Sequence, residues 1–391
     1  GEILNIPEVY HLPLSAPYHF DPSFDQRNQY RTQTMLVAPL KDHQKEVVGV
    51  LQLINATDAA GEVQPFSRQD ETLVLALASQ AAVAINNVRL LDTIKNLFES
   101  LMIYSVSAID ARSPHTAGHS RRVAQYGLAL ALAVNACEHG PLASVSFSDL
   151  ELEELRFSAW LHDIGKIGVP DALLDKKQKL GEANLEAIRW RFYLAGLQAP
   201  SQAERAALME DFDFLIKINR LNYLPPGGAD RLNQIAQRCI CLEEGTRTLL
   251  TPEELSSLLV PRGNLTFQEY TEIQGHALQT LKILEKIPFT KHLGRVPRLA
   301  AAHHERLDGT GYPFQLTSPD LPYQARILAI ADVFDALTST DRPYRSSFNP
   351  ERALKVLQEE AWCGRLDNDL VELFVSQRVY EAVLNQEAAA G

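Results

Sequence analysis

The chain has 391 residues, of which 46% are hydrophobic and 22% are charged. This composition is ordinary for folded protein and the length suits two or three domains, which excludes disorder as the main state. The net charge of −12 argues against a general binder of nucleic-acid polymers, whose affinity depends on many contacts from Lys and Arg to phosphates. A small anionic ligand is not excluded, because metal ions and a few local basic side chains can hold one.

The cysteines and the apolar runs bear on the compartment. Four cysteines in a chain this long do not resemble a disulfide framework, so a reducing, cytoplasmic setting is expected. The longest apolar stretch, residues 123–137, is interrupted by Gln125 and is too short to cross a bilayer. No membrane contact is therefore expected within this chain.

The first predicted elements are two strands and a long helix. Residues 34–55 contain two apolar runs separated by a polar turn at 41–46, which is typical of a pair of strands. Ser67, with Glu71 nearby, marks a helix start. Apolar residues then recur at spacings of three and four with no Pro or Gly, at Leu73, Leu77, Ala81, Ile85, Val88, Leu91, Ile94, Leu97, Leu101 and Met102. A helix with one such apolar face is a common dimerisation element.

From about residue 105 onward the pattern is nearly all helical. Residues 182–262 contain helical segments broken by Pro225, Pro226, Gly227 and Gly228, a strong loop signal. This segment carries no clustered ligand residues, so we interpret it as a large helical insertion.

Histidine and acidic residues are scattered through the helical segments, as in a metal site assembled inside a helical bundle. They are His115, His119, His162, Asp163, His276, His303, His304 and Asp332. Imidazole and carboxylate together suit Fe, Mn, Zn or Ni, whereas the lack of thiolates argues against a structural zinc.

Each of these residues has a structural alternative. A lone histidine on an amphipathic helix is commonly a surface or core residue, and we favour that alternative for His139 and His292. His162 and Asp163 differ, because they follow an apolar run where burial of two polar groups needs an ionic partner. Asp332 lies in the apolar segment RILAIADVFDAL, where the alternative is a salt bridge to Arg326.

Five blocks of the chain, in order, resemble the HD-GYP family of metal-dependent phosphohydrolases. They are HTAGHSRRV at 115–123, LHDIGKIGVPDALL at 161–174, NLTFQEYTEIQGHALQTLKIL at 264–284, HHERLDGTGYP at 303–313 and ARILAIADVFDALTSTDRPYR at 325–345. The order APL, strand, LIN, loop and helix near the N-terminus resembles the later part of a GAF domain, with its early elements cut short.

These resemblances imply a multidomain fold. A partial α+β GAF-like sensor and dimerisation domain is expected at 1–92, and a connecting helix at 93–112. An all-α HD-GYP bundle is expected at 105–391, apart from the insertion at about 182–262. A homodimer through the GAF-like domain and the connecting helix is expected to transmit regulation.

The HD-GYP resemblance also implies an activity, the hydrolysis of cyclic di-GMP to pGpG and then GMP. Its metal ligands carry over to His119, His162, Asp163, His276, His303, His304 and Asp332, with Asp163 bridging two divalent ions. Fe or Mn is expected, with Zn, Ni or Mg as alternatives. Glu272 and Glu305 are candidates to orient the imidazoles. Lys166 is expected to assist catalysis and contact phosphate, while Gly311, Tyr312, Pro313, Arg342 and Arg345 contact the nucleotide.

The chain departs from the family at His115, where many members have a glutamate that helps to hold a third metal. We therefore expect two ions. If a helix starts at Pro114, His115 and His119 share one of its faces and His115 becomes an extra ligand. Two other functions are open: a cyclic di-GMP effector with little turnover, and a phosphodiesterase for a related cyclic dinucleotide.

Overall fold

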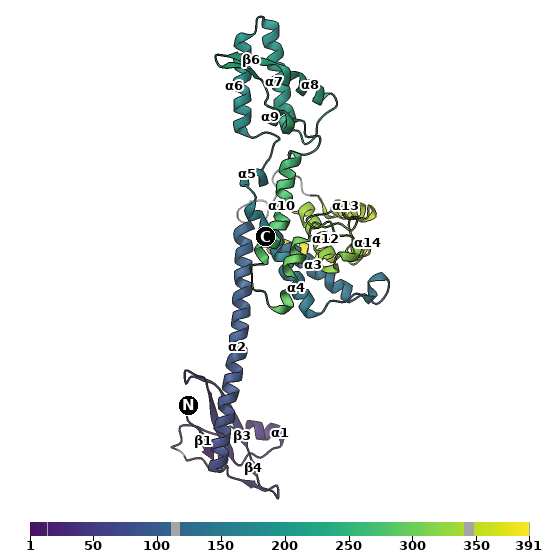
Figure 1. Cartoon of the computed structure of the whole chain (residues 1–391). Helices are drawn as coiled ribbons and strands as arrows, with labels where there is room; N and C mark the ends of the chain where they lie inside the picture. Colours follow the sequence, from purple (N-terminus) through teal and green to yellow (C-terminus); the bar gives the residue numbers. More distant parts are fainter. Residues whose placement is uncertain (14, 111–117, 340–347, 391) are drawn as a thin grey trace. The chain divides into compact units, whose positions relative to one another are not determined.

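The computed structural model describes residues 1–13, 15–110, 118–339 and 348–390 (Figure 1). The chain divides into two compact units, Gly1–Leu101 and Met102–Gly391. The first combines a small antiparallel sheet with helix, and the second is mostly helical, which confirms the predicted fold class.

The first unit is built on a three-stranded antiparallel sheet in the order β1-β2-β3. Strands β2 and β3 are the predicted pair, and Ala38 of β2 lies opposite Leu51 of β3. The elements preceding the long helix are β1 (Leu4–Ile6), η1 (Val9–His11), α1 (Ser23–Asn28), β2 (Met35–Lys41), β3 (Val47–Ile54), β4 (Ala56–Thr57) and β5 (Val63–Gln64). Alternate residues of β2 and one face of the following helix form the core: Leu36, Ala38, Leu40, Val74, Ala78 and Ala82.

The long helix α2 spans Arg68–Asp110 and begins where the sequence predicts. Its first turn is capped by Asp70, however, because the Ser67 N–H donates to Asp70 Oδ2 at 2.7 Å. Glu71, the expected partner, instead accepts a hydrogen bond from Asn5 Nδ2 at 2.7 Å. The start was predicted correctly and the capping acid was not, because Asn5 arrives from a distant part of the chain.

The predicted apolar face of α2 packs on the sheet only in part, through Ala81 and Ile85. The buried part of the contact is made by Val74, Ala78 and Ala82, while Leu73, Leu77, Val88, Leu91, Ile94 and Leu97 are each more than half exposed. Within the described residues α2 alone is long and apolar enough, by length and composition, to cross a membrane. Its first turns nevertheless pack against a protein sheet.

The second unit gathers helices from both ends of its sequence. Its longer helices outside the insertion are α3 (His119–Asn135), α4 (Asp149–Leu161), α10 (Phe267–Leu284), α11 (Val296–Ala301), α12 (Tyr323–Thr338), α13 (Pro350–Trp362), α14 (Asn368–Ser376) and α15 (Val379–Ala390). Short turns join them: η2 (Pro141–Ser144), η3 (Ile164–Gly168), α5 (Asp171–Leu174), η4 (Lys291–Leu293) and η5 (Ser318–Asp320). Three aromatic rings meet in the core, with the Phe334 ring 5.2 Å from Tyr126 and 5.1 Å from Phe374.

The insertion folds around a hydrophobic core of its own, centred on Ile188, Leu215, Ile218 and Leu232. It contains α6 (Glu182–Gln198), α7 (Gln202–Arg220), α8 (Gly228–Gln237) and α9 (Pro252–Leu258). It also contains a hairpin, β6 (Cys239–Leu242) paired with β7 (Gly245–Thr248), that the prediction of a helical insertion missed. Strands of four residues are too short to show a clear alternating pattern.

Candidate metal centre

The turn after α4 places two polar side chains in the interior. His162 and Asp163 follow directly on α4 and are both buried. His162 Nδ1 donates to the Ala159 carbonyl at 2.7 Å, which directs Nε2 inward. Among the described side chains, His162 Nε2 and Asp163 Oδ1 belong to the few buried polar atoms with no hydrogen-bond partner. Such atoms in the interior call for an ion or water.

The same turn is locked against α10 at Gly165. A Cβ at this position would lie 2.5 Å from Thr280 N and closer still to the His276 carbonyl, so only glycine fits. The Gly165 N–H donates to Thr280 Oγ1 at 3.0 Å, and that hydroxyl donates to the His162 carbonyl at 2.9 Å. This contact brings the two helices together at the point where each carries a predicted ligand.

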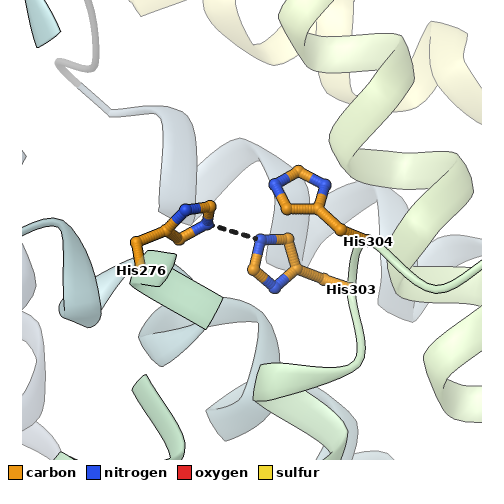
Figure 2. A group of neighbouring side chains, drawn as sticks. All are labelled: His276, His303 and His304. Atoms are coloured by element: carbon orange, nitrogen blue, oxygen red, sulfur yellow. Dashed lines mark hydrogen bonds between the residues drawn. The ribbon is translucent and has the colours of Figure 1, made fainter. Parts of the chain in front are cut away.

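Three histidines from α10 and the turn after α11 point toward one another (Figure 2). His276 Nε2 lies 3.3 Å from His303 Nε2, and the rings of His303 and His304 are 4.0 Å apart. The Nδ1 atoms of His276 and His303 each donate to the carbonyl three residues earlier, at 2.6 Å and 2.7 Å. Their Nε2 atoms are thereby left for a ligand at the centre.

Helices α3 and α12 contribute His119 and Asp332. His119 Nε2 lies 3.2 Å from Asp332 Oδ1, and Asp332 Oδ2 lies 3.8 Å from His304 Nδ1. The alternative prediction of a salt bridge between Asp332 and Arg326 is wrong, because Arg326 pairs with Asp367 at 2.8 Å instead.

Asp163 lies between two groups of side chains. Its Oδ2 is 3.4 Å from His162 Nε2, and its Oδ1 is 3.4 Å from His276 Nε2. The described residues thus contain two groups whose ligand atoms are mutually within 4.8 Å: His119, His162 and Asp163, and His276, His303 and His304. The structure brings all seven predicted ligands together.

The protonation of the cluster suits cation binding. Burial alone would raise the pKa of Asp163, but Lys166 and His162 outweigh it and hold that pKa well below its usual value. Burial lowers the pKa of His303 and takes that of His304 to about 4, so both imidazoles are neutral. The pKa of His162 is raised to about 10, because its interactions with Asp163 and Asp332 outweigh the effect of burial. A metal ion that binds His162 must therefore displace a proton from this imidazole. The donor set and the unpartnered buried atoms fit divalent ions.

The segment after His304 covers the cluster from one side. The Tyr312 ring lies 4.7 Å from the His304 ring. A Cβ at Gly311 would lie 2.5 Å from Glu305 Cα, which explains the glycine. Glu305, a candidate for orienting the ligand imidazoles, instead accepts from Phe314 N at 2.6 Å and thereby holds this loop.

Of the other residues predicted to act at the site, one lies at the cluster and three lie outside the described residues. Lys166 Nζ lies 2.5 Å from Asp163 Oδ2 and is therefore at the cluster. His115, Arg342 and Arg345 lie outside the described residues. The predicted helix start at Pro114 is wrong for α3, because Gly118 has a φ of 72° and the helix begins at His119.

The sequence interpretation overlooked two charged residues beside the cluster. Asp335 Oδ2 lies 2.7 Å from His119 Nδ1, and Asp335 Oδ1 accepts from Arg122 Nε at 2.7 Å. A signal existed in the sequence, because Asp335 follows Asp332 by three residues and so shares its face of α12.

Comparisons with known proteins agree with this organisation. A GAF domain model matches residues 1–85, and two models, each described as an HD domain, match residues 116–216 and 247–370. Between the two HD matches lies part of the insertion.

Curated relatives match parts of this chain. A 3'3'-cGAMP-specific phosphodiesterase 3 of Vibrio cholerae is 30% identical over 64% of this chain and 33% of its own length. A 3'3'-cGAMP-specific phosphodiesterase 1 of the same organism is 40% identical over 34% of this chain and 30% of its own. A cyclic di-GMP phosphodiesterase of Pseudomonas aeruginosa is 36% identical over 29% and 26%.

The chain spans only between about a quarter and a third of the length of these relatives. Its matched segments nevertheless account for the two units of the structure and for the residues around the histidine and aspartate cluster. The chain therefore has an N-terminal region that matches a GAF domain followed by regions that match an HD domain, and the relatives named here are cyclic di-GMP and 3'3'-cGAMP phosphodiesterases.

Proposed function

We propose that this protein is a metal-dependent phosphodiesterase that hydrolyses a cyclic dinucleotide. The observation that carries the proposal is that seven imidazoles and carboxylates, all buried or half-buried, meet at one place. Two atoms of this cluster, His162 Nε2 and Asp163 Oδ1, are buried and have no hydrogen-bond partner. A structural ion-pair network would satisfy these atoms, whereas a site for divalent cations leaves them free.

The two groups of ligands would hold two divalent ions, with Fe or Mn preferred for this nitrogen and oxygen set. Such ions would supply Lewis-acid chemistry, polarising phosphoryl oxygens and making water nucleophilic near neutral pH. Asp163 is the bridging residue in this proposal, because its two oxygens face different groups. His115 is kept as an extra ligand for a third ion, as its residue type allows.

The chain's own residues would bind and orient the substrate. Lys166, released from Asp163, offers a cation to a phosphate oxygen and to the departing ribose oxygen. Tyr312 offers a ring face for stacking beside His304. Arg342 and Arg345 are proposed to contact guanine or phosphate, with Gly311 and Pro313 shaping the loop.

Cyclic di-GMP is the proposed substrate, giving pGpG and then GMP. A second candidate is 3'3'-cGAMP, favoured by the names of two of the relatives. Both ligands present guanine and two phosphodiesters, so the Lys and Arg contacts suit either. The purine that differs would have to be distinguished by contacts to its exocyclic groups.

The test is direct. Protein loaded anaerobically with Fe(II) or Mn(II) is incubated separately with each dinucleotide, and the products are resolved by chromatography. His303→Ala should abolish turnover, while His139→Ala, at an exposed histidine of the same unit, should not. If the fully metal-loaded protein binds cyclic di-GMP tightly but does not hydrolyse it, the protein is a cyclic di-GMP effector and not a phosphodiesterase.

We further propose a cytoplasmic homodimer in which the GAF domain regulates the HD domain through α2. The exposed side chains of Leu91, Ile94, Leu97 and Leu101 recur at spacings of three and four, so they share one face of α2 that would be buried against a second copy. All four cysteines are free, as expected in a reducing compartment. Sedimentation that shows a monomer at high protein concentration would contradict the dimer.

A further inference from the structure

The predicted ligand histidines differ in what holds their Nδ1 atoms. His162, His276 and His303 each use the carbonyl three residues earlier, at 2.6 to 2.7 Å. This bond fixes the proton on Nδ1 and leaves the Nε2 lone pair directed at the cluster. The backbone thus sets the tautomer of three ligands without help from any side chain.

His119 has no such carbonyl within its own helix. It is the first residue of α3, and Gly118 before it has a φ of 72°, so no earlier turn of this helix exists. The His119 Nδ1 atom instead meets Asp335 Oδ2 at 2.7 Å. The Asp335 carboxylate of α12 therefore accepts the hydrogen bond that a backbone carbonyl accepts from the other three histidines.

Asp335 is itself held firmly. The Arg122 guanidinium donates from Nε to Oδ1 at 2.7 Å and from Nη2 to Oδ2 at 3.1 Å, a two-point contact. Arg122 Nη2 also donates to Ser339 Oγ at 3.1 Å. Asp335 is 1% exposed, so its two oxygens are directed by these protein groups rather than by water.

We propose that Asp335, oriented by Arg122, is a positioning residue that fixes His119 in the Nδ1–H tautomer and so makes its Nε2 a metal ligand. The inference rests on the proposed metal centre. An ionised carboxylate can only accept a hydrogen bond, so the imidazole must place its proton on Nδ1. Asp332 and Asp335, three residues apart on α12, would then act on opposite nitrogens of one ring.

The testing variant is Asp335→Asn, because an amide can also donate. An amide N–H facing Nδ1 would move the imidazole proton to Nε2, where it blocks the metal. The matched control is Asp367→Asn, which removes a second buried carboxylate paired with an arginine, Arg326, whose other hydrogen bonds go to the carbonyls of Leu321 and Ser318. Both variants should lower the unfolding midpoint of the metal-free protein, so stability alone cannot explain a difference between them.

The first measurement is Mn(II) affinity and stoichiometry by competition with a chelator. Asp335→Asn should bind one of the two ions about 10- to 100-fold more weakly, as expected for loss of a partner of a ligand histidine. Asp367→Asn should match the wild type. If Asp335→Asn does not fold, Arg122→Lys keeps the charge but loses the two-point contact, and should weaken the same ion by a smaller factor.

The second measurement reports the tautomer. In the Co(II)-loaded protein, Nδ1 protons of metal-bound imidazoles give shifted, exchangeable proton resonances, and Asp335→Asn should lose one of them. Wild-type affinity together with a full set of these resonances in the variant would overturn the inference while leaving the metal centre intact. A wild-type protein that binds no divalent ion would overturn the proposed function, and this inference with it.

Discussion

The contact at Gly165 is the tightest test of how the metal centre is assembled. Replacing this glycine by alanine puts a Cβ 2.5 Å from Thr280 N and 2.7 Å from Thr280 Oγ1, with the His276 carbonyl closer still. Two of these three atoms are backbone, so they cannot rotate away. The turn that carries His162 and Asp163 must move off α10.

The size of the effect follows from what is lost. Overpacking a core costs about 1–3 kcal/mol, and backbone obstruction belongs at the upper end. The two hydrogen bonds of Thr280 Oγ1 would break as well, at about 0.5–1.5 kcal/mol each. We expect Gly165→Ala to destabilise the HD domain by about 3 kcal/mol or more.

The same helical turn provides the control. A Cβ at Gly168 would meet Gln279 Cγ at 3.5 Å and Gln279 Cδ at 3.9 Å, which is ordinary contact with a flexible side chain. Gly168→Ala should therefore change stability by less than about 1 kcal/mol, with any gain coming from the unfolded chain. Comparing the two variants cancels the effect of glycine on that unfolded state.

The assay is chemical denaturation followed by tryptophan fluorescence. All three tryptophans lie in the second unit, so the signal does not report on the GAF domain. Metal retention after dialysis is measured in parallel, since moving the turn separates Asp163 Oδ1 from His276 Nε2, now 3.4 Å apart. An unfolding midpoint for Gly165→Ala equal to that of Gly168→Ala would refute the close-packing argument.

The other predictions concern the metal ligands, pH and assembly. Asp163→Ala should lose both ions and all turnover. Lys166→Ala, which removes the side chain 2.5 Å from Asp163 Oδ2, should keep the metals and lose turnover. Elemental analysis that finds two equivalents of metal in Asp163→Ala would exclude a bridging role for Asp163. Burial lowers the pKa of His304 to about 4 in the metal-free protein. Between pH ~6.5 and ~4 the unfolded chain then binds a proton that the folded chain does not. The free energy of unfolding should therefore decrease as the pH is lowered through this window, by up to about 1.4 kcal/mol per pH unit. Unfolding midpoints in chelator that stay level across this window would contradict that expectation. Leu91→Glu combined with Ile94→Glu should shift sedimentation from dimer to monomer without changing the HD domain's unfolding midpoint, and an unchanged dimer would remove α2 from the interface.

Local sequence pattern by itself determined several features of this protein. The strands at 34–55 and the helix start at Ser67 depend on neighbours in the sequence, and both were confirmed. The seven ligands were named from the resemblance to the HD-GYP family, while the cost of burying polar groups in apolar segments pointed by itself to His162, Asp163 and Asp332. Their mutual proximity agrees with that prediction, although their roles as ligands stay a proposal.

Tertiary structure alone decided which partners these residues have. No local pattern shows which groups Asp335, Glu305 and Thr280 hold, and only the packing of α12, the loop after His304 and α10 identifies them. It also decided that Val74, Ala78 and Ala82 are buried on the sheet while Leu73, Leu77 and Leu91 of α2 stay exposed. Periodicity is set by residues three or four apart, but a hydrogen bond between residues 216 positions apart, such as His119 with Asp335, exists only once the helices that carry them have packed.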